Sequence, residues 1–266
     1  DGEQALAAER GFWDAVFSSE LAIGLVYVSF AYSGWNAAIY VAGEVRSPSH
    51  SLPRALVLGT LIVTLLYLGL NLVLLGGAPA AALSGQVEVA QIAAVGLFGQ
   101  GAATLLSALI ALGLISTVGA FVMTGPRVYE AMGEDFPRLA LLARRRPGGG
   151  PALAIGIQAV LAIVMALSAS FDALLEYIGL TLTLITGLTA AGVFVLRVRE
   201  PGLERSYRTL GYPLTPLIFL GLTLWMAVHT ALGGPWIAAL SLVTILSGLG
   251  LYWILRRPSP PSPAPG

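Results

Sequence analysis

The chain has 266 residues, of which 56% are hydrophobic and 11% are charged, and its mean hydropathy is +0.83. A soluble domain carries about 25% charged residues, so this composition excludes an ordinary soluble protein and indicates a membrane protein. The chain has no cysteine, so it offers no thiol chemistry. Its formal net charge is zero, and we expect no nucleic-acid partner.

Apolar runs of about 18 residues or more are long enough to cross a ~30 Å hydrocarbon core, and they predict an all-α, polytopic membrane protein with about seven transmembrane helices. An extracellular lead-in over 1–19 precedes the transmembrane domain, 20–256, and a Pro/Ser-rich cytoplasmic tail over 257–266 is expected to be disordered. Residues 126–142 are expected to form an amphipathic surface helix. The expected spans lie at about 20–45 (broken), 54–76, 98–124, 151–169, 174–196, 213–232 and 235–255.

The placement of arginine predicts how these spans are oriented. The connectors after the first, third and fifth spans contain arginine, as does the end of the chain, whereas the alternate connectors contain none. By the positive-inside rule, the N-terminal end lies outside and the C-terminus lies in the cytoplasm. We therefore expect a multi-pass protein of the plasma (inner) membrane. An outside start without a signal peptide or targeting sequence also suggests that further helices precede this chain.

The first expected span contains Ser33 and Gly34 between the aromatic residues Tyr32 and Trp35. Glycine costs roughly 1 kcal/mol relative to alanine in a helix, and serine competes for backbone hydrogen bonds, so we expect the helix to break here. About ten residues lie on either side, and at 1.5 Å per residue this places the break near the middle of the bilayer. Unwound backbone at that depth must be buried in protein or line a cavity, which makes the break a candidate binding site.

The two ends of a broken helix offer opposite partial charges. Carbonyl groups at the end of the first arm suit an ammonium group, and N–H groups at the start of the second arm suit a carboxylate. A zwitterionic amino acid supplies both, and broken helices near the midplane are a common binding device of secondary transporters. The alternative is a glycine kink that packs against a neighbouring helix, in which the aromatic residues only fill the space between helices.

Several motifs follow one another along the chain. Residues 30–36 read Phe-Ala-Tyr-Ser-Gly-Trp-Asn, 44–49 read Glu-Val-Arg-Ser-Pro-Ser, and 52–55 read Leu-Pro-Arg-Ala. Further on, 124–135 read Thr-Gly-Pro-Arg-Val-Tyr-Glu-Ala-Met-Gly-Glu-Asp, and 207–216 read Tyr-Arg-Thr-Leu-Gly-Tyr-Pro-Leu-Thr-Pro. In this order they resemble the amino acid–polyamine–organocation (APC) superfamily of permeases, in particular its L-type, neutral amino-acid branch. The resemblance covers most of the chain and corresponds to the C-terminal portion of such a permease, its sixth to twelfth transmembrane helices.

The resemblance implies a leucine-transporter-type inverted-repeat fold, of which this chain supplies the second repeat and two extra helices. A complete transporter would then need the missing N-terminal five helices. The implied function is secondary-active transport of a neutral amino acid by alternating access, coupled to a proton or sodium, with membrane lipid around the protein and no cofactor. The substrate amine would meet backbone of the broken helix, and the aromatic residues would wall the side-chain pocket. The implied substrate-binding residues are Phe30, Ala31, Tyr32, Ser33, Gly34, Trp35 and Asn36.

Ser116 and Thr117 lie at membrane depth in the third expected span. In related folds, small hydroxyl residues on this helix hold a sodium ion or face a lysine that takes its place, and hydroxyl oxygens suit such an ion. The resemblance therefore makes both residues candidates for ion coupling. Membrane helices also use serine and threonine simply to pack closely, and that alternative stays open.

Three other functions compete with a neutral amino-acid permease. A polyamine or organic-cation transporter of the same superfamily is one, but the residues around the break lack the carboxylates that a polycation needs. A truncated, transport-inactive membrane fragment is another. A membrane enzyme would need an acid–base pair, a nucleophile or a metal cluster at the site. The sequence shows none of these, so we expect neither enzymatic activity nor a metal site.

Overall fold

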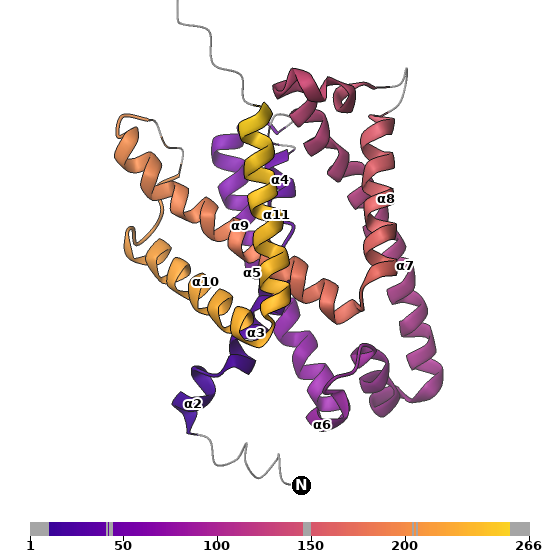
Figure 1. The fold of residues 1–266 in the computed structure, drawn as a ribbon. Helices are drawn as coiled ribbons and strands as arrows, with labels where there is room; N and C mark the ends of the chain where they lie inside the picture. Colours follow the sequence, from indigo (N-terminus) through magenta and orange to yellow (C-terminus); the bar gives the residue numbers. More distant parts are fainter. Residues whose placement is uncertain are drawn as a thin grey trace, which may run out of the picture. The chain divides into compact units, whose positions relative to one another are not determined.

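The computed structural model describes residues 11–40, 42, 45–145, 150–203, 205 and 207–255, and these residues form helices without strands (Figure 1). The tail over 257–266 and the first ten residues of the lead-in lie outside the described residues. The 3-10 helix η2 spans Pro137–Ala143. In chain order the α-helices are α2 (Phe12–Val16), α3 (Ser19–Ala31), α4 (Ala37–Tyr40), α5 (Pro48–Gly77), α6 (Ala80–Leu83), α7 (Val89–Asp135), α8 (Ala152–Ser168), α9 (Phe171–Arg199), α10 (Leu214–Gly233) and α11 (Pro235–Leu255).

Local sequence signals account for where several helices begin. The Ser18 side chain accepts a hydrogen bond from the Leu21 N–H (3.1 Å) at the start of α3, and the Ser170 side chain accepts one from the Ala173 N–H (3.3 Å) at the start of α9. Such N-caps satisfy backbone donors that the helix itself leaves without partners. Helix α5 instead begins with Pro48, whose missing N–H costs nothing in a first turn.

Five helices of the described part of the chain, α5, α7, α9, α10 and α11, are long and apolar enough to cross a membrane. Two further apolar helices, α3 and α8, are shorter, with 13 and 17 residues. The sequence predicts about seven spans, and the difference arises at these two helices. Helix α3 is short because the chain leaves the helix after Ala31. The protein is therefore an all-α, multi-pass membrane protein.

The chain divides into two compact units, which we describe separately. The first unit consists of residues 1–34, 135–140 and 159–266, and α9 is at its centre, in contact with α3, α10 and α11. Helix α10 also contacts α3 and α11. Ala22 and Val26 of α3, Leu180 of α9 and Met226 of α10 are buried in this bundle. Helix α3, which leads into the helix break, is thus held against α9 and α10.

The second unit consists of residues 35–134 and 141–158. In this unit the end of α5 lies close to the start of α7, where a Cβ added to Gly77 would lie 2.6 Å from the Ala93 carbonyl oxygen and one added to Gly96 would meet the Gly77 carbonyl. Only hydrogen fits at these two positions. Gly99 then adopts a left-handed conformation (φ 80°), so α7 consists of two helical segments, 89–98 and 100–135.

The segment after the apolar part of α7 differs from the prediction. The sequence predicts an amphipathic surface helix over 126–142, but α7 continues through Pro126 to Asp135 and is followed by η2. Arg145, which follows η2 in the chain, forms a two-pronged ion pair with Glu130 of α7, in which Nε donates to Oε1 and Nη2 donates to Oε2 (2.9 Å). Glu130 is only 7% exposed, so this pair satisfies a buried carboxylate and ties the connector back to α7.

Candidate functional site

The broken segment consists of an arm, a turn and a short second arm. Helix α3 ends at Ala31, residues 32–36 form turns, and α4 begins at Ala37. The Tyr32 N–H donates to the Val28 carbonyl (3.0 Å), and the Ser33 N–H donates to the Phe30 carbonyl (2.9 Å), which tightens the last turn before the chain leaves the helix. Gly34 has φ 98°, a conformation that L side chains rarely adopt.

The residues singled out from the sequence are distributed over this break. Phe30 and Tyr32 are half-buried, whereas Ala31, Ser33 and Gly34 are exposed in the first unit. Trp35, which is 42% exposed, and Asn36 open the second unit. The structure therefore places the first five residues together at the C-terminal end of α3. That end carries the partial negative charge of the helix dipole, which suits a cationic group.

The position of the α3 arm is set by a glycine that the sequence analysis did not single out. A Cβ added to Gly179 of α9 would lie 2.9 Å from Cγ1 of Val26, 3.5 Å from the Val26 carbonyl oxygen and 3.7 Å from Cβ of Phe30. The two helices approach this closely because position 179 has no side chain. Gly179 thus supports Phe30, a candidate binding residue, from the neighbouring helix.

Hydroxyl groups tie α9 to α11 on another side of the same unit. The Tyr177 hydroxyl hydrogen-bonds the Thr244 hydroxyl (2.7 Å), and the Thr181 hydroxyl lies 3.0 Å from that of Ser241, which is fully buried. Thr181 also donates to the Tyr177 carbonyl (2.7 Å). These hydroxyls satisfy one another between two apolar helices, and they stabilise the scaffold behind the α3 arm.

Ser116 and Thr117, the candidates for ion coupling, lie in the second segment of α7 and belong to the second unit. Both are exposed, and the Thr117 hydroxyl donates to the Gly113 carbonyl (3.0 Å) one turn earlier. This bond uses the hydroxyl proton and leaves oxygen lone pairs for an ion. Within the described residues, no group of three or more His, Cys, Asp or Glu side chains is arranged to hold a metal ion.

The α7 and α8 helices meet at a second glycine contact in the second unit. The Gln158 side chain of α8 donates from Nε2 to the Phe121 carbonyl of α7 (3.1 Å), and its Oε1 lies directly against Gly125. Any side chain at position 125 would displace the Gln158 amide. The Gly125-Pro126 motif therefore serves as a contact point for α8, in addition to any role in ending the apolar part of α7.

Comparison with known proteins places these features in a family. Residues 3–253 match the family model described as amino acid permease. The chain is 31% identical over 232 residues to a serine/threonine exchanger of Bacillus subtilis, a match that covers 86% of this chain and 53% of the relative. It is 27% identical over 254 residues to the mouse Asc-type amino acid transporter 1, covering 91% of this chain and 46% of the relative. It is 28% identical over 245 residues to the human large neutral amino acids transporter small subunit 2, covering 88% of this chain and 44% of the relative. The chain spans about half the length of the curated relatives it matches.

Proposed function

The chain belongs to the amino acid permease family, and from this membership we propose that it works as a secondary-active transporter of neutral amino acids rather than as an enzyme. The observation that carries the proposal is the helix break at residues 32–36, in a chain that matches the family over 3–253. Unwound backbone in an apolar segment must be buried in protein or line a cavity, because each unmet polar group costs several kcal/mol in lipid, and a substrate-binding cavity is the reading that the family favours.

The end of α3 supplies the chemistry for one half of an amino acid. Backbone carbonyls of the last turn, around Phe30, Ala31 and Ser33, would accept hydrogen bonds from the substrate ammonium group. Gly34 would allow the substrate to approach the backbone closely, since it has no side chain. We propose that Tyr32 and Trp35 line the side-chain pocket and that Asn36 completes the site.

The names of the relatives support a neutral substrate. They include a serine/threonine exchanger and a transporter of large neutral amino acids, and the α3 turn carries no acidic side chain that would favour a cation. Coupling to a proton or sodium ion through Ser116 and Thr117 belongs to the same proposal. We further propose that alternating access requires five helices in addition to those of this chain, because the relatives are about twice as long.

Uptake into proteoliposomes tests the proposal. Radiolabelled leucine, alanine, serine and a polyamine would be offered to vesicles that contain the 266-residue chain or a longer polypeptide with five family helices in front of it. We expect uptake of the neutral amino acids, and not of the polyamine, by the longer polypeptide alone.

Three outcomes would contradict parts of this proposal. Uptake of the polyamine in preference to leucine would overturn the substrate class. Uptake by the 266-residue chain alone would overturn the need for further helices. Failure of both polypeptides, in vesicles shown to contain them in folded form, would overturn neutral amino-acid transport.

A further inference from the structure

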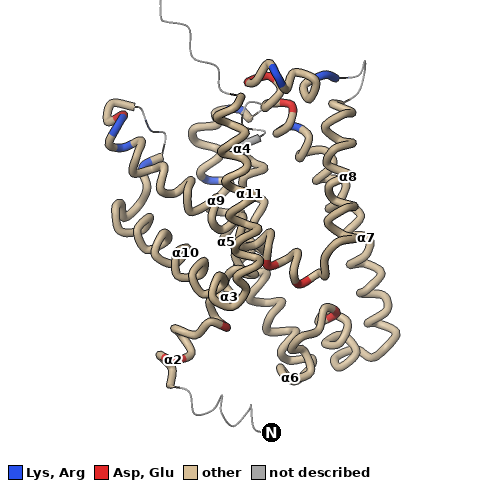
Figure 2. The backbone as a smooth tube through the Cα atoms, viewed as in Figure 1, with Lys and Arg blue, Asp and Glu red and all other residues tan. Residues whose placement is uncertain are grey.

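The connector between α9 and α10 gathers positive charge at one end of the first unit (Figure 2). Residues 197–213 contain four arginines, Arg197, Arg199, Arg205 and Arg208, against two glutamates, and of the glutamates only Glu200 belongs to the described residues. The α9 helix ends within this segment, so the charge lies at the end of a helix that is apolar enough to cross a membrane.

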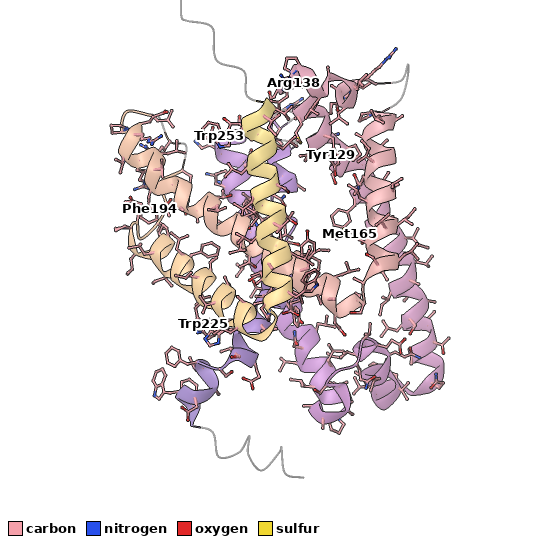
Figure 3. All side chains as sticks on the ribbon, in the orientation of Figure 1. Tyr129, Arg138, Met165, Phe194, Trp225 and Trp253 are labelled. Carbon is pink, nitrogen blue, oxygen red and sulfur yellow. The ribbon has the colours of Figure 1, made fainter. Side chains whose placement is uncertain are left out.

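Arg197 is held in place by an aromatic platform. Its guanidinium carbon lies 3.6 Å from the centre of the Tyr212 ring, and the ring of Phe194, labelled in Figure 3, lies 5.3 Å from the same ring. A guanidinium stacked on an aromatic face keeps its N–H donors in the plane of the group, where they can meet a planar or tetrahedral oxyanion. Within the described ranges, no hydrogen bond joins Arg197 to another residue, so its N–H donors have no acceptor among these residues.

The described residues of the connector are linked by hydrogen bonds of their own. Arg205 donates to the carbonyls of Glu200 (2.9 Å), Pro201 (3.3 Å) and Leu203 (3.2 Å), and the Thr215 hydroxyl donates to the Leu210 carbonyl (2.7 Å). Arg205 therefore shapes the loop, and the Tyr212 ring beneath Arg197 belongs to an ordered turn. A preformed site of this kind loses little entropy when it binds a ligand.

Large apolar side chains that are near the arginines in the sequence are exposed. Val198 and Leu210 are each 80% exposed, and Leu214 is 64% exposed. A free phosphate ion would need only the arginines. A phospholipid matches both features, because its phosphate meets the guanidinium while its acyl chains cover the leucines and the valine.

We propose that the α9–α10 connector binds the headgroup of an anionic phospholipid, with Arg197, stacked on Tyr212, as the residue that holds the phosphate. Arg199 and Arg208 add positive charge that distinguishes an anionic headgroup from a zwitterionic one. This site goes beyond the proposed transport function and does not depend on it, because lipid binding is measured without substrate.

Native mass spectrometry of the detergent-solubilised chain tests the site. The chain would be titrated with phosphatidylglycerol or phosphatidylcholine, and bound lipid would be counted. We expect phosphatidylglycerol to bind more tightly, and Arg197→Gln to weaken its binding about fivefold, the effect expected of one basic residue near a membrane surface. Tyr212→Leu should weaken binding as well, although it leaves the charge unchanged, because the guanidinium loses its platform.

Arg54→Gln is the matched control, because it removes the same charge from an exposed position on α5. It should leave phosphatidylglycerol binding within twofold of the unaltered chain, and inorganic phosphate in excess should not displace the lipid. The proposal is overturned if the two lipids bind equally, if Arg54→Gln weakens binding as much as Arg197→Gln does, or if inorganic phosphate competes at the concentration of the lipid. Circular dichroism of each variant confirms that its helices remain folded.

Discussion

Gly34 combines a left-handed backbone with open space around its α-carbon. Its φ is 98°, and an added Cβ would meet no atom within 4 Å, so a side chain there would cause backbone strain without a clash. Gly34→Ala should destabilise the turn by about 1–2 kcal/mol, the cost of a left-handed conformation for an L residue. A thermal melt monitored by the intrinsic tryptophan fluorescence of the detergent-solubilised chain would show the loss.

Gly24→Ala is the control for this prediction. Gly24 also has no atom within 4 Å of an added Cβ, but it lies inside α3 with a helical backbone. This variant should be neutral or more stable by up to about 1 kcal/mol, because alanine favours helix. Equal melting temperatures for the two variants would show that the turn at 32–36 is not what limits stability. In a transport-competent polypeptide, Gly34→Leu should abolish substrate binding while Gly24→Leu should not.

The Tyr177 hydroxyl provides a second single-residue test. Tyr177→Phe removes the bond to Thr244, whose hydroxyl retains its bond to the Leu240 carbonyl (2.9 Å). Because the partner is not left unsatisfied, the loss should be only about 0.5–1 kcal/mol. Thermal melts of Tyr177→Phe, Thr244→Val and the double variant would measure it. A double variant whose loss equals the sum of the two single losses would argue against the hydrogen bond.

Contact between α3 and α9 depends on a position where no side chain fits. Gly179→Ala would place a methyl group 2.9 Å from Val26 Cγ1, so the helices must separate or Val26 must change rotamer. Overpacking of this kind should cost about 1–3 kcal/mol. We expect a lower melting temperature for the chain and, because Phe30 lies over the same position, weaker substrate binding in a transport-competent polypeptide.

Two further variants test whether the loss of stability comes from the contact between α3 and α9. Gly192→Ala, in the same helix but with nothing within 4 Å of the new methyl group, should be neutral or slightly stabilising. Adding Val26→Ala to Gly179→Ala should recover part of the lost stability by making room. If Gly192→Ala lowers the melting temperature as much as Gly179→Ala does, the loss does not come from the α3 contact.

The helices themselves could be predicted because length and apolar composition are local properties. The glycine and serine near residue 33 likewise indicate a break, and α3 does end at Ala31. The contact of Gly179 with Val26 could not be predicted, since it depends on which helices pair. The helical continuation of α7 through Pro126 was also missed, because proline usually marks a helix boundary. Whether Ser116, Thr117 and the turn residues bind ligands stays a prediction.

At the scale of the whole molecule, we predict the membrane orientation from the arginine pattern, and this prediction can be tested directly. The chain has no cysteine, so single cysteines can be introduced without interference. Ser84→Cys, between α6 and α7, should react with a membrane-impermeant maleimide added outside the cell. Ser49→Cys, in the first turn of α5, should react only after the membrane is permeabilised, because its connector carries Arg46 and Arg54.

The two cysteines serve as controls for each other, since both native serines are exposed and differ only in the expected side of the membrane. Labelling of Ser49→Cys from outside, with Ser84→Cys protected, would reverse the proposed orientation. Labelling of both from outside would mean that α5 does not cross the membrane.

The close approach of α3 and α9 has a consequence for how this family changes over time. Val26 and Gly179 share one small volume, so a larger residue at one position requires a smaller residue at the other. A substitution at only one of the two positions gives a less stable protein, so the two positions should change together. Among aligned relatives, we expect the summed side-chain volume at these two positions to vary less than the volume at either one.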